Sequence, residues 1–549
     1  MKISVSSLGG AGEIGMNMYI YETDRYAVIV DCGVKFTKSD EIGVDLIIPD
    51  FSYIETIKHK KIMLIITHAH EDHIGAVPYL IKEYPDIAVV CGRYSWDIIN
   101  KKLNEHDISV SQIYIDDFKP FEWGDFEITA YPVSHSIHGT YAVLLKIAEE
   151  FKAVHISDYK IDYSPVTCTP FPLKEFIELG KDSVDLLMAD STNIIKSGFT
   201  KGEHQVIKGI DEVFKQAFGR IFFTTFASNT ERLQTVFNTA EKYGRKVALE
   251  GSSLIKHIDT AKKHGKLSFN DDILISRKQI EKLDDNKICF IATGSQGEGA
   301  SVITKVAEND YSDIKVRKGD TFVFSSRIIP GNEHRIIYIM NNVYEKGGSV
   351  ITTDDLPIHV SGHAAKEDAL LLLNILKPKY LVPIHGEVQH LAKHKQLAVK
   401  YGMLDKKVIF FLAGNKIIFE NGRFIEKQDI TAGKRYVDLN TEEFLTPDEL
   451  KNRKKLAING AVVVVNSAEN VENINENNII IQLIGFSIEK EYINILKQSI
   501  IEYSQKETGG IHQKENFNEF TEQTVKRFFK KRFNKRPHIN IINIHNGAL

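Results

Sequence analysis

Short runs of apolar residues alternate with polar, glycine-rich segments along the first two hundred positions of the chain. The runs at residues 27–30, 62–66 and 88–90 are rich in aliphatic side chains, and each has the length of one strand. Stretches with helical spacing separate them, as at residues 77–81. Strands that alternate with helices are typical of an α/β domain, and we predict one over residues 1–204.

A second series of strands and helices occupies residues 205–355. Its apolar runs, such as 221–223 and 246–249, each lead into a loop rich in Gly, Ser or Thr, which favours a small Rossmann-like domain. Beyond it, over residues 356–428, the pattern of the first domain resumes. We therefore predict that the Rossmann-like domain is inserted into the first domain.

The remainder of the chain has a different organisation. The polar stretch at residues 429–454 is typical of a linker, and residues 455–549 favour a small α+β domain. This domain is expected to contain an Asn-rich turn at 466–478 and two helices before a final strand near 539–543.

Composition narrows the class of protein. The chain has 549 residues, of which 43% are hydrophobic and 26% charged, and this is typical of a soluble globular protein. No apolar run reaches the length that spans a bilayer, and the first residues lack a signal-peptide pattern, so we expect a cytoplasmic protein without a membrane partner. The four cysteines are scattered singly, which argues against a disulfide framework. The net charge of −4 argues against a protein that coats nucleic acid nonspecifically.

The segment at residues 67–75 carries four potential metal ligands within six positions. His68 and His70 lie two apart after an apolar strand, so their side chains project to the same side. If a helix starts near Asp72 and runs through residue 81, Asp72 and His73 leave its first turn beside them. Imidazole and carboxylate ligands suit Zn²⁺, and two pairs suggest two ions. The alternative is a polar turn with surface histidines.

Further candidate ligands follow other apolar runs. Open α/β sheets gather functional groups at the carboxyl ends of their strands, which places these residues near the first cluster. A carboxylate at Asp158 would bridge two ions, while His135 and His385 would complete one ion each. Asp31 would fix the tautomer of a ligand histidine from outside the ligand shell. Taken alone, each residue also fits a turn or capping role.

A glycine-rich stretch at residues 10–15 matches the GxGxxG pattern of dinucleotide-binding proteins. The residues that follow it, 16–21, alternate like a strand, whereas nucleotide binding requires a helix there. We therefore predict a tight turn between two strands at this place.

The ligand set and several other motifs resemble a known family. The matching stretches include residues 8–15, 190–193, 226–229, 293–298, 325–332, 361–363, 383–387 and 536–537. Together with the ligands they resemble the β-CASP branch of the metallo-β-lactamase superfamily, and within it the bacterial ribonuclease J family. The chain departs from the family pattern at His138 and at Glu231, which puts details of the substrate channel in question.

The resemblance implies a fold and an assignment of ligands. The fold is a metallo-β-lactamase αββα sandwich with an inserted Rossmann-like β-CASP domain and a small C-terminal α+β domain. Two Zn²⁺ ions are implied, with Mn²⁺ or Mg²⁺ as possible substitutes. The implied ligands are His68, His70 and His135 for one ion, Asp72, His73 and His385 for the other, and Asp158 for both.

The resemblance also implies a reaction. Water activated between the ions would attack an RNA phosphodiester, and His363, oriented by Asp190, would protonate the leaving oxygen; Asp72 is counted with them as catalytic. The alternative for His363 is that it only caps the helix expected near Ala364. The implied activity is 5′-to-3′ exonuclease and endonuclease cleavage in messenger decay and ribosomal RNA maturation.

Several loops are candidates for substrate binding. Loops that follow strands and open helices point backbone N–H groups toward an anion such as a 5′-phosphate. The candidates are Ser228, Asn229, Gly251, Ser252, Ser253, Ser361, Gly362, His363 and Ala364. The alternative for each loop is an ordinary helix cap.

Partners follow from the resemblance and from the C-terminal domain. The expected ligand is RNA with a 5′-monophosphate end, and the expected assembly is a homodimer or homotetramer, with a paralogous subunit as a possible partner. The segment 526–536 interleaves cations with aromatic residues and would attract RNA, but at helical spacing Phe528, Phe529 and Phe533 favour a core-facing role. The competing functions are an RNA-binding subunit without activity and a small-molecule metallo-hydrolase.

Overall fold

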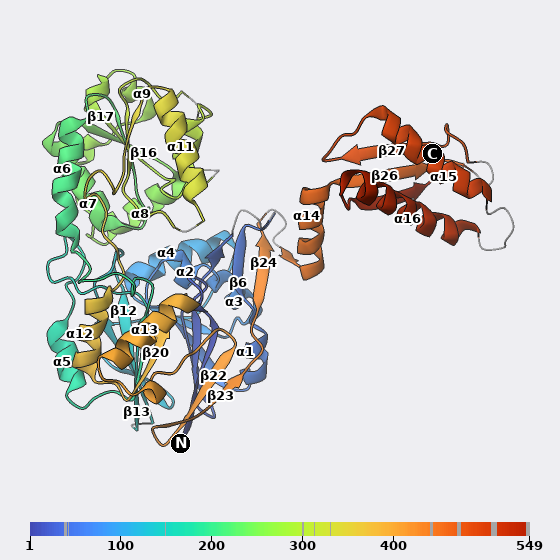
Figure 1. Cartoon of the computed structure of the whole chain (residues 1–549). Helices are drawn as coiled ribbons and strands as arrows, with labels where there is room; N and C mark the ends of the chain where they lie inside the picture. Colours follow the sequence, from blue (N-terminus) through green and yellow to red (C-terminus); the bar gives the residue numbers. More distant parts are fainter. Residues whose placement is uncertain are drawn as a thin grey trace. The chain divides into compact units, whose positions relative to one another are not determined.

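The computed structural model divides the chain into two compact units (Figure 1). The first unit comprises Met1–Phe36 and Ile47–Arg435, and the second comprises Thr37–Leu46 and Tyr436–Leu549. The structure describes residues 1–37, 41, 43–148, 150–298, 301–311, 313–329, 331–439, 443–468, 474–506 and 513–544, without the side chains of 503–506 and 513–516.

Two β-sheets form the centre of the first unit. The eight-stranded sheet has the order β23-β22-β1-β3-β4-β7-β8-β9 and the six-stranded sheet the order β10-β11-β12-β13-β14-β20. The strands of the first sheet are β1 (Lys2–Gly9), β3 (Met18–Glu22), β4 (Tyr26–Val30), β7 (Lys61–Ile65), β8 (Ala88–Cys91), β9 (Gln112–Tyr114), β22 (Asn415–Glu420) and β23 (Arg423–Asp429). Those of the second are β10 (Phe121–Trp123), β11 (Phe126–Pro132), β12 (Tyr141–Ile147), β13 (Phe151–Ile156), β14 (Leu186–Asp190) and β20 (Tyr380–Ile384).

Alternate residues of these strands build the core between the sheets. Val28 and Met63 from the first sheet pack in one buried cluster with Val143 and Leu186 from the second. Along each strand of the second sheet, the residues that alternate with these core residues face outward and pack against helices. Those helices are α5 (Leu173–Gly180), α12 (Lys366–Leu376) and α13 (Val388–Lys400).

Further helices lie on the opposite side of the paired sheets from α5 and α12, as Figure 1 shows. They are α1 (Ser52–Ile57) and α3 (Val77–Glu83), and α4 (Arg93–Glu105) packs against α3. Helix, two sheets and helix therefore form four layers, which confirms the predicted αββα sandwich.

The glycine-rich stretch at residues 10–15 connects β1 to β3. These two strands are antiparallel neighbours, and within the stretch β2 (Ala11–Gly12) pairs with β21 (Gly386–Glu387). Gly10, Gly12 and Gly15 all have φ between 79° and 90°, a backbone conformation that favours glycine. A strand follows the glycines where nucleotide binding would need a helix, so the predicted turn between two strands is confirmed.

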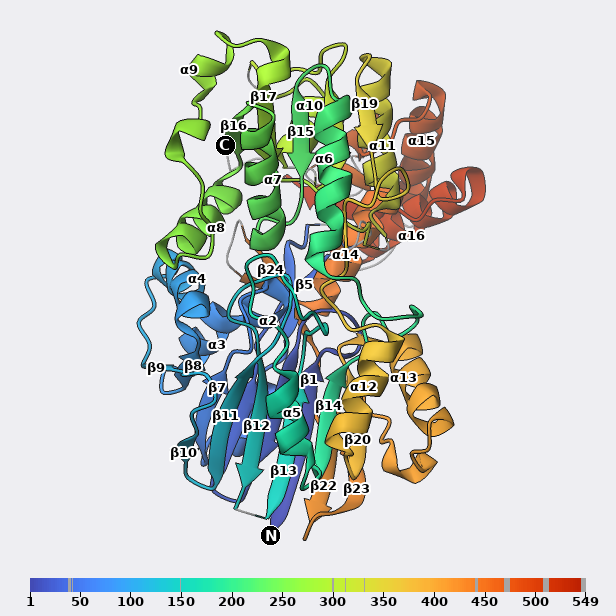
Figure 2. The ribbon, with the colours of Figure 1, turned by 90° about the vertical axis from the view of Figure 1, so that its left-hand side faces the viewer.

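The inserted domain is built on a five-stranded parallel sheet of order β16-β17-β15-β18-β19 (Figure 2). Its strands are β15 (Ile221–Thr224), β16 (Lys246–Glu250), β17 (Ile288–Ala292), β18 (Thr321–Phe324) and β19 (Ser349–Ile351). Its helices are α6 (Val206–Gln216), α7 (Thr230–Lys242), α8 (Ser252–Lys263), α9 (Arg277–Ile280), α10 (Val302–Ala307) and α11 (Glu333–Glu345). A parallel sheet with crossover helices is the predicted Rossmann-like arrangement.

A buried ion pair lies at the base of the inserted domain. Arg232 on α7 contacts Glu203, which precedes the domain, with 2.5 Å between Nε and Oε1. Arg232 also donates to the carbonyl oxygen of Ile358, on the segment that leaves the domain. Both side chains are buried, so one guanidinium ties the entering and leaving segments to α7.

The second unit contains a three-stranded sheet of order β27-β26-β28, formed by β26 (Ala461–Asn466), β27 (Ile479–Ile484) and β28 (His538–Asn543). Helices α15 (Lys490–Lys506) and α16 (Gln513–Phe533) contribute to its core. Phe528 and Phe529 are buried there and Phe533 packs against them, which confirms their predicted core-facing role.

Residues 429–454 contain β24 (Lys434–Asp438), β25 (Glu443–Leu445) and the start of α14 (Pro447–Asn459). Residues 440–442 of the expected linker and 469–473 of the expected Asn-rich turn lie outside the described residues. Across the described ranges, no helix is both long enough and apolar enough to cross a bilayer.

Candidate metal centre

The carboxyl ends of strands from both sheets supply the polar side chains of the site. Strands β4 and β7 are parallel neighbours in the first sheet, and β13, β14 and β20 are parallel neighbours in the second. Their ends therefore meet at one edge of the sandwich. The residues at or just beyond these ends, together with the end of β11, are Asp31, His68, His70, His135, Asp158, Asp190 and His385.

Asp72 and His73 lie on α2 (Glu71–Ile74), a single helical turn. We expected one helix from Asp72 through residue 81, and this expectation is wrong, because α3 starts separately at Val77. Pro78 occupies the first turn of α3, where its missing N–H costs nothing, and it would break a continuous helix. The short α2 still places Asp72 and His73 beside the strand-end histidines.

Three histidines and one carboxylate oxygen form the first ligand group. His70 Nδ1 lies 3.1 Å from His68 Nε2 and 3.1 Å from His135 Nε2. Asp158 Oδ2 lies 3.4 Å from both of these Nε2 atoms. All four ligand atoms therefore surround one point.

A second group lies on the other side of Asp158. Asp72 Oδ2 is 3.6 Å from His73 Nε2 and 3.3 Å from His385 Nε2. The second oxygen of Asp158, Oδ1, lies 3.4 Å from His73 Nε2. Each oxygen of the Asp158 carboxylate thus faces a different ligand group.

These separations fit divalent cations. Ligand atoms held tetrahedrally at about 2.0–2.1 Å from Zn²⁺ lie roughly 3.3 Å apart, which is close to the spacing in both groups. His385 Nε2 is buried and faces Asp72 Oδ2 without a well-aligned hydrogen bond, while Asp158 and Asp72 raise the pKa of the ring to about 10. A cation at this place would therefore replace the proton that the two carboxylates favour. Both donor sets combine imidazole with carboxylate, the mixture that Zn²⁺ accepts.

Neighbouring groups orient the ligand histidines through their other ring nitrogens. His73 Nδ1 lies 2.7 Å from Asp31 Oδ2, and His135 Nδ1 lies 2.7 Å from the carbonyl oxygen of Gly362. His68 Nδ1 lies 3.0 Å from the Thr67 hydroxyl. Each contact fixes the ring and leaves Nε2 facing the ligand group. Asp31 thus contacts the ring nitrogen of His73 that points away from the ligand atoms.

Backbone strain accompanies this arrangement. Asp31 and His385 have φ values of 62° and 47°, a left-handed conformation that costs about 1–3 kcal/mol for residues other than glycine. The chain also passes very close to itself, because a Cβ at Gly33 would lie 1.7 Å from the carbonyl oxygen of Asp72. Strained backbone of this kind clusters at functional sites.

Burial and carboxylates act in opposite directions on the ligand pKa values. Burial lowers the pKa of His70 and of His135 well below the ordinary value, so both rings are neutral and free to bind a cation. Burial also disfavours a charged His73, but the carboxylates of Asp158, Asp72 and Asp31 raise its pKa well above the ordinary value. A proton and a cation therefore compete for His73.

His363 lies beside the metal groups and contacts Asp190. Its Nδ1 is 2.9 Å from Asp190 Oδ2, and its side chain remains 24% exposed while that of Asp190 is buried. Burial lowers the pKa of His363, but Asp190 and Asp158 outweigh this effect and raise it above the ordinary value. Helix α12 begins at Lys366 and Asp368 accepts from the N–H of Ala365, so Asp368 fills the capping role considered for His363.

The candidate substrate residues fall into different environments. Asn229 is buried and its side chain accepts from the N–H of Arg232, so it caps α7. Ser252 and Ser253 are exposed at the start of α8, and Gly251 precedes them with a φ of 123°. The Ser361 hydroxyl accepts from the N–H of His363. Ser228 and Gly362 are half-buried, whereas Ala364 is buried in the core beneath the second sheet.

The two departures from the family pattern contact the same loop. His138 Nε2 lies 3.2 Å from the hydroxyl of Thr167, while Glu231 Oε1 accepts from the N–H groups of Thr167 and Cys168. Glu231 lies on α7 of the inserted domain, so these contacts join that domain to the first one. Both side chains are buried, and neither contacts a ligand group directly.

Two further residues, absent from the predicted set, position the ligands. Asn17 Nδ2 lies 3.2 Å from His73 Nε2 and 3.2 Å from the carbonyl oxygen of Asp72. The Ser157 hydroxyl donates to Asp31 Oδ2 at 3.1 Å. Ser157 directly precedes a predicted ligand at a strand end and was detectable on that ground. No local signal in the sequence marks Asn17.

Family models match three parts of the chain. Residues 11–144 match the metallo-beta-lactamase superfamily, residues 218–343 the ribonuclease J beta-CASP domain, and residues 357–410 the Zn-dependent metallo-hydrolase RNA specificity domain. The order of these matches confirms the predicted fold class, with the β-CASP domain inserted.

Curated relatives extend the similarity to nearly the whole chain. Ribonuclease J of Helicobacter pylori strain B128 is 34% identical over 548 residues, which cover 98% of this chain and 78% of the relative. Ribonuclease J of Thermus thermophilus is 32% identical over 84% of this chain and 82% of its own length. A solved Enterococcus faecalis protein of unknown function shares the fold at 15% identity and a TM-score of 0.54, over 76% of this chain and 100% of its own. The two-sided ligand arrangement, the three domain matches and this coverage agree, and the chain belongs to the ribonuclease J family and is a metal-dependent ribonuclease.

Proposed function

We propose that the protein hydrolyses RNA as a two-metal, zinc-dependent enzyme with 5′-to-3′ exonuclease and endonuclease activity. The observation that carries this proposal is the Asp158 carboxylate, whose two oxygens face two separate ligand groups. In two-metal hydrolases the ions lie about 3.5–4 Å apart, a distance that a single carboxylate bridges. When bound, such cations supply Lewis acidity, which activates water and neutralises charge on a phosphodiester.

The ligand residues prepare the site for this chemistry. His68, His70 and His135 would hold one cation, Asp72, His73 and His385 would hold the other, and Asp158 would serve both. The hydrogen bonds of Asp31 and Gly362 fix the rings of His73 and His135 before a cation arrives, so little reorganisation accompanies binding. Mn²⁺ or Mg²⁺ would replace Zn²⁺ less well, because imidazole is a poor ligand for these harder ions.

His363 supplies the proton that the leaving 3′-oxygen needs. Asp190 holds Nδ1 of the ring and raises the pKa of His363, so the partly exposed ring keeps its proton to higher pH than a free imidazole does. Donation from this ring and recovery of the proton from solvent would complete each turnover. Ser361 supports the position of His363 by accepting from its N–H.

Substrate ends are recognised in the inserted domain. The exposed Ser252 and Ser253 at the start of α8 offer hydroxyl and backbone N–H groups to a 5′-monophosphate, with Ser228 and Asn229 at the start of α7 as the second candidate. A terminal phosphate held at a fixed distance from the cations favours removal of nucleotides from the 5′ end, and entry without this anchor permits internal cuts. We place this activity in messenger decay and ribosomal RNA maturation in the cytoplasm. The proposed assembly is a homodimer or homotetramer, or an assembly with a paralogous subunit.

The test measures cleavage of RNA that carries 5′-monophosphate, 5′-triphosphate or 5′-hydroxyl ends, with chelator, Zn²⁺ or Mn²⁺ present. We expect cleavage to stop in chelator, to return with Zn²⁺ and to be fastest for the monophosphate. Asp158→Asn should lower activity at least about 100-fold and reduce the metal content measured by mass spectrometry. Asp116→Asn is the matched control, because Asp116 is exposed and pairs with Lys119.

Two results would contradict the proposal. Full activity of metal-free protein would remove the role of the cations. RNA binding without cleavage under every metal condition would instead favour an RNA-binding subunit that supports an active partner.

A further inference from the structure

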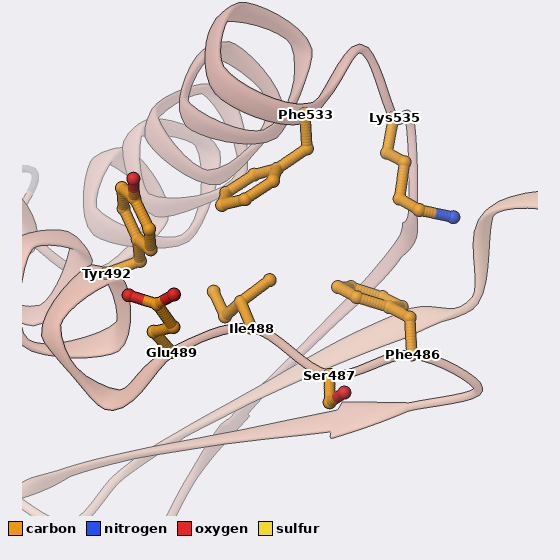
Figure 3. Close-up of a pocket in the computed structure, with 7 residues that line it drawn as sticks. All are labelled: Phe486, Ser487, Ile488, Glu489, Tyr492, Phe533 and Lys535. Carbon is orange, nitrogen blue, oxygen red and sulfur yellow. The ribbon is translucent and has the colours of Figure 1, made fainter.

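The C-terminal unit contains an open pocket with aromatic walls (Figure 3). Its volume is about 490 Å³, within the range of small-ligand sites. Phe486, Ile488 and Glu489 come from the segment after β27, Tyr492 from the first turns of α15, Phe533 from the end of α16, and Lys535 from the turn before β28. Two segments distant in sequence, 486–492 and 533–535, therefore build one site.

The rings of this pocket are held in place by neighbours and remain partly exposed. Phe533 packs edge-to-face on Tyr492, with ring centroids 5.2 Å apart, and Phe486 packs in the same way on the buried Phe529 at 5.4 Å. The Lys535 ammonium lies 5.4 Å from the centre of the Phe486 ring. The pocket thus offers preorganised aromatic surface beside a cation.

The lining residues Phe533 and Lys535 belong to a basic stretch of the chain. Residues 526–536 contain seven lysines and arginines and no acidic residue, and six of the seven side chains are exposed. This segment includes the end of α16, which supplies Phe533, and Arg532 lies over the Tyr492 ring at 5.5 Å. Such a field attracts a polyanion, although the whole chain has a net charge of −4.

We propose that this pocket binds one unpaired base of a single-stranded RNA, stacked on its aromatic rings, with the flanking phosphates held by Lys535 and the cations of residues 526–536. The inference rests on the proposed function, since it concerns the substrate of that enzyme. Aromatic platforms flanked by basic residues are the common means of holding single strands, because every base has a π-face.

The carboxylate of Glu489 adds a preference among bases. It lies at the rim of the pocket in Figure 3, near the backbone end of the Tyr492 side chain and away from its hydroxyl. A carboxylate accepts hydrogen bonds from exocyclic amino groups, which cytosine, adenine and guanine carry and uracil lacks. It would also repel phosphate, so the base edge and not the backbone should face it. Cytosine and adenine oligomers should therefore bind here more tightly than uracil oligomers.

The experiment measures binding of fluorescent 2′-O-methyl RNA octamers to the full chain by anisotropy in chelator, so that no cleavage occurs. Tyr492→Ala should weaken binding about tenfold, the usual loss for one stacked base. Lys535→Ala should reduce the slope of log Kd against log salt by about 0.7, because one phosphate contact is lost. Glu489→Gln should abolish the preference for cytosine over uracil. Lys451→Ala, an exposed cation on α14, is the control and should change nothing.

An octamer that carries a photo-crosslinking group identifies where RNA binds on the unsubstituted protein, so the result does not depend on the folding of a variant. We expect crosslinked peptides to contain Phe486, Tyr492 or Phe533. If circular dichroism shows that Tyr492→Ala is unfolded, the salt dependence of RNA binding by Lys535→Ala and the positions of the crosslinks test the inference instead. Unchanged affinity and salt dependence in folded variants, or crosslinks only elsewhere, would overturn the inference. Variants that change only the sedimentation of the protein would overturn it too, because the pocket would then be a contact between copies.

Failure of this inference differs from failure of the proposed function. Wild-type protein that cleaves RNA with metal, but whose pocket variants bind octamers normally, refutes only the pocket. Wild-type protein that binds octamers through the pocket, but cleaves no RNA with any metal, refutes only the proposed function.

Discussion

Asp31 Oδ2 lies 2.7 Å from Nδ1 of His73, and both side chains are buried. Asp31 also accepts from the N–H and the hydroxyl of Thr67, which precedes the ligand His68. Burial alone would raise the pKa of Asp31, but His73 and the hydrogen bonds outweigh this effect and lower it. An ionised Asp31 therefore orients ligands on both the strand end and α2 without contacting an ion itself.

We predict that Asp31→Asn weakens metal binding about 10–100-fold, because an amide cannot orient the His73 ring as a carboxylate does. Zinc titration with a competing chelator measures this loss. Asp125→Asn serves as control, since Asp125 pairs with the exposed Arg25 and belongs to neither ligand group. Equal zinc affinity in Asp31→Asn and in the unsubstituted protein would show that Asp31 has no role at the centre.

The Asp190–His363 pair predicts a change in pH dependence. Asp190 raises the pKa of His363, and a general acid works only while it is protonated, so activity should fall as pH rises through this pKa. Asp190→Asn should move the alkaline limb of the kcat profile to lower pH and leave the zinc content unchanged. His363→Gln should remove that limb and lower kcat about 10²–10⁴-fold. An Asp190→Asn profile identical to that of the unsubstituted enzyme would contradict this role.

Buried His394 on α13 predicts acid sensitivity of the fold. Burial lowers its pKa to about 4, below the ordinary value near 6.5. Between pH 6.5 and pH 4 the unfolded chain therefore binds a proton at this residue and the folded chain does not. The contribution of neutral His394 to the free energy of unfolding is complete above pH 6.5 and is lost as pH falls toward 4. The loss is on the order of 3 kcal/mol for this group.

His394→Gln removes this titration and retains a partner for the Ser191 hydroxyl, which lies 2.9 Å from Nδ1. Urea denaturation at pH 7.5 and pH 4.5 should show a smaller difference for the variant than for the unsubstituted protein. The same pH difference in both proteins would mean that other groups account for the acid sensitivity.

The buried Arg232–Glu203 pair predicts a large cost on substitution. Glu203→Gln leaves the guanidinium without its countercharge and should lower the free energy of unfolding by about 3–5 kcal/mol. Asp285→Asn breaks an exposed pair with Arg317 and should cost less than about 1 kcal/mol. Calorimetry on both variants compares them directly. Similar melting curves for the two variants would contradict a stabilising role for the buried pair.

Local patterns predicted much of the fold and of the site. The alternation of apolar runs indicated the α/β character, and the spacing of His68, His70, Asp72 and His73 indicated a ligand cluster whose members are near neighbours along the chain. The helix after this cluster was predicted as continuous and is broken, because α3 starts separately at Val77 with Pro78 in its first turn. Asn229 was a candidate for substrate binding, and its side chain also caps α7. The residue type alone does not show this capping role.

The sequence by itself determined the residues that can bind metal, because a strand end and the turn after it fix neighbouring side chains through backbone geometry alone. Only the tertiary structure decided that Asp158 has one oxygen toward each ligand group, and that His138 and Glu231 meet at the loop of Thr167. These contacts depend on strand order and on the packing of one domain against another. Both are set by the sum of many long-range interactions, which no local spacing records.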